Sequence, residues 1–180
     1  MNAARVLAPI VSALAVCAYR LVGPARLDPD ARWPERLHRR WFPALTSPVR
    51  RWLPGTAARE VSEDEYALTL PLPPGEVERG LHERGFVRHP LSRVKTREGV
   101  ESVGSWVRLD RLLARRMLHV MLFAGEDGET THVYAHEEYS SLNPLVAYAH
   151  YAGEGQSAAA GVERVRELLP RPSRDVTPSP

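Results

Sequence analysis

Residues 117–139, MLHVMLFAGEDGETTHVYAHEEY, decide the fold of this chain. Two segments rich in apolar and β-branched residues, Met117–Ala124 and Thr130–Tyr139, flank an Asp127-Gly128 pair, a combination typical of a β-hairpin turn. A two-residue turn centred on Asp127-Gly128 fixes the pairing of the strands. It places His119 directly opposite His136.

This register divides the predicted hairpin into two faces. The apolar face carries Leu118, Val120, Leu122, Val133 and Ala135, with Glu137 at its end. The other face carries His119, Met121, Phe123, His132, Tyr134, His136 and Glu138. A slip of one residue would mix the two sets, so the clean separation supports the register.

The second face has three possible roles. His119 and His136, with Glu138 further along the same strand, form a donor set found in open metal sites. Alternatively, the face lines a cleft for an apolar ligand, built from His119, Met121, Phe123, His132, Tyr134 and His136. The third role, which the residue types favour, is a surface that is solvated or covered by helices.

The flanking sequence predicts an α+β domain over residues 61–170. We expect a strand at Glu65–Leu72, a helix at Gly75–Arg84, a hairpin with arms Phe86–Lys95 and Glu101–Leu109, a short helix at 145–151 after Asn143-Pro144, and a helix at Ser157–Leu169. The order is strand, helix, four strands and two helices. It predicts an antiparallel sheet of about five strands with helices packed on one face.

The amino-terminal residues 1–25 read as a hydrophobic anchor or signal. The run Val6–Tyr19 is almost wholly apolar, and six arginines follow it within residues 20–40 while Arg5 alone precedes it. Basic flanks stay on the cytoplasmic side, so we expect a retained anchor and a cytoplasmic domain. A cleaved or lipidated signal, with export, stays open as an alternative.

Residues 26–60 read as a basic linker at the membrane interface, rich in Trp, Arg and Pro. Trp33, Trp41 and Trp52 suit the boundary between lipid and water, and Arg39 and Arg40 suit anionic headgroups. Packing of the tryptophans on the domain is the alternative. Residues 171–180 are rich in proline, and we expect them to be disordered.

Charge argues against nucleic acid as a partner of the domain. Lys and Arg number 24 against 22 Asp and Glu, but the basic excess lies in residues 1–60, and the remainder is mildly acidic. The chain has no phosphate-binding Gly-rich loop, nucleophile elbow or His-Glu-x-x-His motif, and Cys17 lies in the apolar run.

Residues 105–151 resemble small uncharacterised proteins of haloarchaea. The pattern comprises Ser105-Trp106-Val107, Leu118-His119-Val120, Leu122-Phe123, Val133-Tyr134-Ala135-His136 and Asn143-Pro144. No reaction is assigned to that family, so the resemblance implies none here. The basic amino-terminal arm departs from it.

Two functions follow as hypotheses. The first is a membrane-tethered, non-enzymatic module without a cofactor that binds a lipid, a small apolar ligand or a protein. The second is a metal-dependent enzyme that holds a divalent ion with His119, His136 and Glu138. Binding of metal separates the two.

Overall fold

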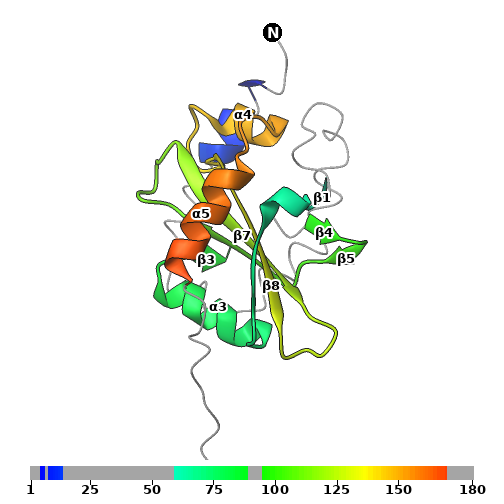
Figure 1. Cartoon of the computed structure of the whole chain (residues 1–180). Helices are drawn as coiled ribbons and strands as arrows, with labels where there is room; N and C mark the ends of the chain where they lie inside the picture. The colour runs from blue at the N-terminus through cyan, green and yellow to red at the C-terminus, as the bar shows by residue number, and fades with distance from the viewer. Residues whose placement is uncertain (1–4, 7, 14–58, 89–94, 170–180) are drawn as a thin grey trace, which may run out of the picture.

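A five-stranded antiparallel sheet forms the centre of the domain (Figure 1). A computed structural model of the chain describes residues 5–6, 8–13, 59–88 and 95–169. The strands, in spatial order, are β2 (Tyr66–Leu70), β8 (Thr131–Tyr139), β7 (Arg116–Ala124), β6 (Gly104–Arg108) and β3 (Val87–Arg88). The predicted α+β class with a five-stranded antiparallel sheet is confirmed.

Strands β7 and β8 pair in the predicted register. His119 lies opposite His136 and Met121 lies opposite Tyr134. The turn is longer than predicted, because the Gly125 N–H donates to Thr130 O at 2.8 Å and Glu126 to Glu129 form the loop. The register is unchanged, since the loop gains one residue on each side of Asp127-Gly128.

Helices α3 (Pro74–Glu83) and α5 (Ala158–Leu168) cover the apolar face of the sheet (Figure 1). The core between them contains Ala67, Leu68, Leu70, Val77, Leu81, Phe86, Trp106, Leu118, Val120, Leu122, Val133, Ala135, Val162, Val165 and Leu169. Helix α5 begins at the Ser157 cap, as predicted. It meets β8 very closely, because a Cβ on Gly161 would stand 2.2 Å from the Cα of His136.

A small second sheet lies on the opposite side of the long strands (Figure 1). Its strands are β1 (Arg59–Glu60), β4 (Lys95–Arg97) and β5 (Val100–Glu101), and β1 runs parallel to β4. The 3-10 turn η3 (Glu63–Glu65) follows β1.

The predicted hairpin with arms 86–95 and 101–109 forms in two parts rather than as one ladder, because Val87–Arg88 pair with residues 106–107 of β6 and residues 96–97 of β4 pair with Val100–Glu101. Glu98 and Gly99 do make a tight turn, with φ angles of 51° and 78°, but it joins only β4 to β5. The bond from Ser102 N to Lys95 O ends this small sheet, and the bond from Val103 N to Leu122 O begins the main ladder. Each predicted arm is therefore divided between two sheets.

The short helix α4 (Ala147–Ala152) starts later than predicted. Asn143 caps a preceding turn, because its Oδ1 accepts from Leu145 N at 3.0 Å and its carbonyl accepts from Val146 N. The helix ends at Gly153, whose φ of 75° is left-handed.

The amino-terminal helix packs on α4 in its described residues, 5–6 and 8–13. Ala8 is fully buried and clusters with Ala147 and Tyr151, and the Arg5 guanidinium lies 5.4 Å from the centre of the Tyr148 ring. Within the described parts of the chain, no helix has both the length and the apolar character required to cross a bilayer.

Several predictions fall outside the described residues. They concern the rest of the apolar segment, residues 14–25, the linker to residue 58 and the tail 171–180. The interface candidates Trp33, Trp41, Trp52, Arg39 and Arg40 also lie there.

Candidate metal centre

His119, His136 and Glu138 converge beneath the small sheet, and we call them the His–His–Glu cluster. His119 Nδ1 lies 3.2 Å from His136 Nε2 and 3.1 Å from Glu138 Oε1, while His136 Nε2 lies 3.5 Å from Glu138 Oε2. Their exposed fractions are 2%, 0% and 5%. The sequence predicted these three residues as a set, and their donor atoms all lie within 4.8 Å of one another.

Each histidine of the cluster has its own outer partner. Ser105 Oγ lies 2.8 Å from His119 Nε2, and Glu65 Oε1 lies 2.5 Å from His136 Nδ1. Strand β6 supplies Ser105, and the end of η3 supplies Glu65. The second oxygen of Glu65 accepts from Ser62 N at 2.7 Å in a capping box, which fixes the carboxylate in place.

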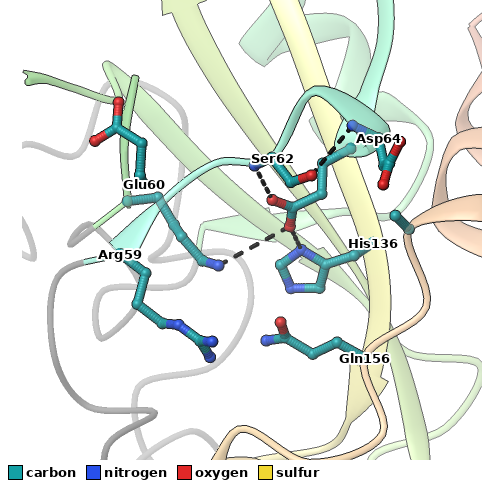
Figure 2. Close-up of a pocket in the computed structure, with 9 residues that line it drawn as sticks. Arg59, Glu60, Ser62, Asp64, His136 and Gln156 are labelled. Atoms are coloured by element: carbon teal, nitrogen blue, oxygen red, sulfur yellow. Dashed lines mark hydrogen bonds and ion pairs between the residues drawn. The ribbon is translucent and has the colours of Figure 1, made fainter. Parts of the chain in front are cut away.

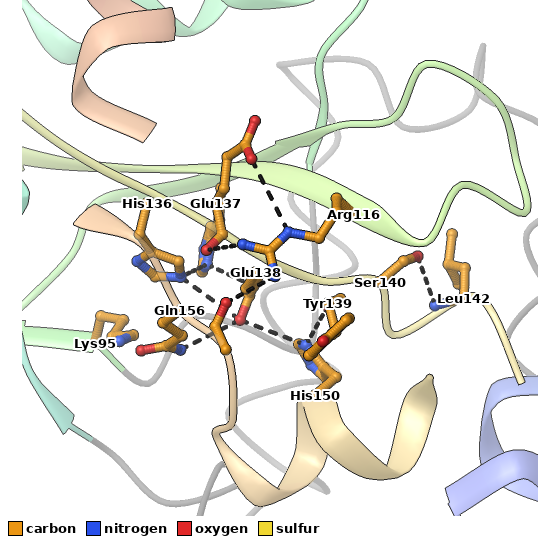
Figure 3. A network of polar contacts seen from close by, with 12 residues as sticks. Lys95, Arg116, His136, Glu137, Glu138, Tyr139, Ser140, Leu142, His150 and Gln156 are labelled. Atoms are coloured by element: carbon orange, nitrogen blue, oxygen red, sulfur yellow. Dashed lines mark hydrogen bonds and ion pairs between the residues drawn. The ribbon is translucent and has the colours of Figure 1, made fainter. Parts of the chain in front are cut away.

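The carboxylate of Glu138 is held from the other side (Figure 3). His150 Nδ1 on α4 lies 3.4 Å from Glu138 Oε2 and bonds to Tyr139 O at 2.9 Å. Gln156 Nε2 donates to the same Glu138 oxygen at 3.4 Å. All three members of the cluster are thus oriented by neighbours, the arrangement that metal ligands in proteins usually have.

These partners determine which nitrogens carry protons. The Glu65 carboxylate accepts only, so His136 Nδ1 carries a proton and donates it. If Ser105 Oγ accepts from His119 Nε2 in the same way, then His119 Nδ1 and His136 Nε2 both present lone pairs to each other and to Glu138. In that tautomer three acceptors meet, and a cation or an added proton joins them. In the other tautomer Ser105 donates to His119 Nε2 and His119 Nδ1 donates to Glu138 Oε1 at 3.1 Å.

Electrostatics of the metal-free cluster favours one added proton, on His136. Burial opposes it, but the Glu138 charge and the hydrogen bonds to Glu138 and Glu65 outweigh burial and raise the pKa of His136. Burial lowers the pKa of His119 to about 4, against a weaker opposing effect of Glu138.

The two carboxylates around the cluster stay ionised. Burial would raise their pKa, but the charges of His150 and His136 hold the pKa of Glu138 well below its usual range. Hydrogen bonding and charge from His136, followed by Lys95, lower the pKa of Glu65 to about 2.

The geometry approaches that of a tetrahedral metal site. Ligand atoms about 2.0 Å from zinc are about 3.3 Å apart at the tetrahedral angle. The two contacts of His119 Nδ1, 3.1 Å to Glu138 Oε1 and 3.2 Å to His136 Nε2, are close to that edge length, and one ligand atom from each of the three residues lies within 4.8 Å of the others. In addition, Glu138 Oε1 is buried, and its 3.1 Å contact among the described residues is with His119 Nδ1, another member of the cluster.

A pocket of about 230 Å³ adjoins the cluster (Figure 2). Its inner wall contains His136, Glu65 and Lys95, and Gln156 and Arg59 line it as well. Of the His–His–Glu cluster, His136 lines the pocket, and Gln156 also lines it and donates to Glu138, so the pocket adjoins the cluster at these two residues.

Ser105, His119 and Glu138 also have the spacing of a serine–histidine–acid triad. Ser105 Oγ lies 2.8 Å from His119 Nε2, and Glu138 lies 3.1 Å from His119 Nδ1. However, Ser105 is 0% exposed and does not line the pocket, so no substrate reaches it. Its position supports orientation of His119 rather than nucleophilic catalysis.

The other predicted ligand-face residues lie apart from the pocket. Met121, Phe123 and Tyr134 are buried with Val61 in a small apolar cluster. His132 is only partly buried, and its Nδ1 bonds to Thr69 Oγ1 at 2.8 Å. This face is therefore covered rather than solvated, and binding of an apolar ligand by these residues stays a prediction.

Sequence reasoning missed Glu65, Lys95 and Ser105 as parts of the site. Glu65 had a usable signal, since Ser62 three residues before it forms the capping box. Lys95 and Ser105 had none, because their approach depends on the division of the predicted hairpin between two sheets.

No protein-family model matches the chain, and neither a curated protein nor a solved structure is significantly similar to it. The resemblance to haloarchaeal proteins therefore rests on the sequence motifs alone.

Proposed function

We propose that the domain is a metal-dependent enzyme that binds a divalent transition metal, zinc in the first place, through the His–His–Glu cluster. The observation that supports the proposal is the convergence of two histidines and a carboxylate, all buried, with one ligand atom from each within 4.8 Å of the others. Between the two functions expected from the sequence, this geometry supports the metal-dependent one better.

Two features favour a catalytic ion over a structural one. The cluster supplies three protein ligands, whereas structural zinc sites have four. His150 does not complete the set, because its Nδ1 is engaged with Tyr139 O at 2.9 Å. The fourth position is then available to water or to a carbonyl or phosphoryl oxygen, which a bound metal polarises. A small substrate would approach the ion from the adjoining pocket, which His136 lines.

Titration of the full-length protein with zinc tests this function. After treatment with a chelator, we expect tight binding of one zinc ion per chain in calorimetry. His119→Ala and His136→Ala should abolish binding, and Glu138→Gln should weaken it. His132→Ala is the matched control, since His132 lies on the same face of β8 but outside the cluster. Absence of binding, or binding unchanged by His136→Ala, contradicts the proposal.

We also propose that the end of the domain that carries α4 contacts a membrane surface. Exposed apolar side chains lie on the amino-terminal helix and beside α4: Val6, Ile10, Val11, Leu113 and Leu145. Leu145 is 91% exposed, and the Asn143 side chain bonds to the backbone of both Leu113 and Leu145. Arg111 and Arg115 are exposed close by and suit anionic headgroups.

Vesicle flotation tests the membrane contact. Full-length protein should float with vesicles that contain phosphatidylglycerol, and Leu145→Asp should reduce the floating fraction. Val100→Asp is the control, because Val100 is 65% exposed but lies in the small sheet. Equal effects of the two variants would disprove a specific surface. Protection of a carboxyl-terminal tag from external protease in intact cells tests the expected cytoplasmic side.

A further inference from the structure

The pocket beside the metal centre contains Lys95, the chain's single lysine. Of the 24 Lys and Arg residues, 23 are arginine, so the chain supplies positive charge almost everywhere as guanidinium. Lys95 is also unusual in position, since only 8% of it is exposed, at the start of β4. A lysine differs from arginine in one chemical respect that matters here: its amine can lose a proton and then acts as a nucleophile.

The surroundings of the Lys95 amine raise the fraction that is neutral. Its nearest carboxylate oxygen, Glu65 Oε1, lies 3.9 Å from Nζ, beyond hydrogen-bond distance. Both Glu65 oxygens are already engaged, by His136 Nδ1 and by Ser62 N. Burial is the largest effect on the amine and lowers the pKa of Lys95, although Glu65 and Glu138 oppose it.

A second cation, Arg59, lies next to Lys95. The two residues are direct partners in the parallel β1–β4 ladder, and both line the pocket. Neighbouring strands are about 4.8 Å apart, so a small molecule can meet both side chains. A guanidinium is well suited to a carboxylate, which it binds through two parallel hydrogen bonds.

We propose that Lys95 is a reactive amine that condenses with a small oxo acid, whose carboxylate is bound by Arg59. The neutral Lys95 Nζ attacks the carbonyl carbon, and the carbonyl oxygen takes up a proton to give a carbinolamine. The nitrogen gives up two protons in all, one to the carbonyl oxygen on addition and one to the hydroxyl as it leaves, with solvent as the carrier. The hydroxyl leaves as water, and an imine links Lys95 to the acid. Amine and carbonyl give imine and water, with no change in oxidation state.

Reductive trapping on the full-length protein tests this inference. The chain is incubated at pH 7 with pyruvate, cyanoborohydride and a metal chelator, and the adduct is located by peptide mass spectrometry. We expect native Lys95 to be labelled faster than Lys95 in the urea-unfolded chain, since a lowered pKa raises the neutral fraction at pH 7. A native rate equal to or below the unfolded rate, or labelling confined to the terminal amine, overturns the proposal.

Methyl pyruvate tests the role of Arg59, because it has the same carbonyl without the carboxylate. Each labelling rate of Lys95 is divided by the rate of the same reagent with the unfolded chain. The normalised rate with pyruvate should exceed that with methyl pyruvate about tenfold. Arg59→Gln should make the two rates equal but leave Lys95 reactive. Equal normalised rates of the two reagents in the wild-type protein would contradict an oxo acid as the substrate. Lys95→Arg should show no internal adduct yet still bind zinc. The outcome for Lys95 is therefore independent of the outcome for zinc binding.

Discussion

Two clusters of buried charge lie on opposite faces of the same sheet, and they differ in how they are balanced. On the helix-covered face, Arg88 Nη2 lies 2.7 Å from Glu78 Oε1, and the Trp106 indole N–H lies 3.3 Å from that oxygen. The Arg88 guanidinium also lies 4.9 Å from the Trp106 ring centre. On the other face, the His–His–Glu cluster brings acceptors together beside a pocket.

The difference shows what buried charge can mean. In the Glu78–Arg88–Trp106 cluster, two donors meet one carboxylate and the charges cancel, so packing alone explains it. In the His–His–Glu cluster, acceptors outnumber the available protons when His119 Nε2 donates to Ser105 Oγ. Burial of charge therefore marks a candidate site only where donors and acceptors do not match.

The largest expected effect is that of a substitution in the Glu78–Arg88–Trp106 cluster. Glu78→Ala leaves the Arg88 guanidinium without its carboxylate at a position that is 1% exposed. The free energy of unfolding in urea should fall by about 3–5 kcal/mol, with or without zinc. Glu83→Ala on the same helix is the control, and it should change stability by less than about 0.5 kcal/mol, because Glu83 is exposed. A loss below about 1 kcal/mol in Glu78→Ala would show that the ion pair is not needed.

The stability of the metal-free protein should depend on pH through the His–His–Glu cluster. The pKa of His119 is about 4 in the folded chain, below its reference value of 6.5. The unfolded chain therefore binds more protons between these values, and stability falls as the pH drops from about 6.5 to about 4. The loss should reach about 3 kcal/mol. His136 adds no slope there, because its raised pKa keeps it protonated in both states.

Urea unfolding at a series of pH values, with chelator present, measures this loss. His119→Gln removes the titrating imidazole and should flatten the upper part of this range, while Glu65 and Glu138, whose pKa values are lowered, still reduce stability as the pH approaches 4. A wild-type curve that is already flat in this range would mean that His119 is protonated in the folded protein.

Zinc bound at the His–His–Glu cluster should stabilise the folded protein by slightly less than the pH effect. At a free zinc concentration one hundred times the dissociation constant, the free energy of unfolding should rise by about 2.7 kcal/mol. The rise should vanish in His136→Ala and persist in Glu83→Ala, measured by urea unfolding at pH 7. An equal rise in both variants would place the ion elsewhere.

The smallest effect concerns the outer partner of His119. Ser105→Ala removes the 2.8 Å contact with His119 Nε2 and should cost about 1 kcal/mol of stability. It should also weaken zinc binding about tenfold, since outer partners of metal ligands contribute 10–100-fold to affinity. Ser102→Ala is the control, because the Ser102 hydroxyl is buried without a hydrogen-bond partner among the described residues. Unchanged affinity in Ser105→Ala would limit Ser105 to packing.

The sequence was sufficient to predict the β7–β8 hairpin and the proximity of His119, His136 and Glu138. Alternation of two kinds of side chain around Asp127-Gly128 specifies both the register and the face, and both are local properties. The small sheet is different, because nothing between Glu101 and Gly104 signals that the chain changes sheets there. Lys95 and Glu65 therefore could not be placed beside His136 from their sequence neighbours.

The close contact between α5 and β8 has a consequence for biosynthesis. Beyond Tyr134, the outer edge of β8 is not paired with β2; Glu137 instead exchanges two backbone hydrogen bonds with Ser157. Gly161 then rests on the backbone of His136. A nascent chain shorter than about residue 161 therefore carries an open strand edge, which readily pairs with other chains. The edge of β8 near His136 is therefore protected from such pairing only after α5 has been synthesised.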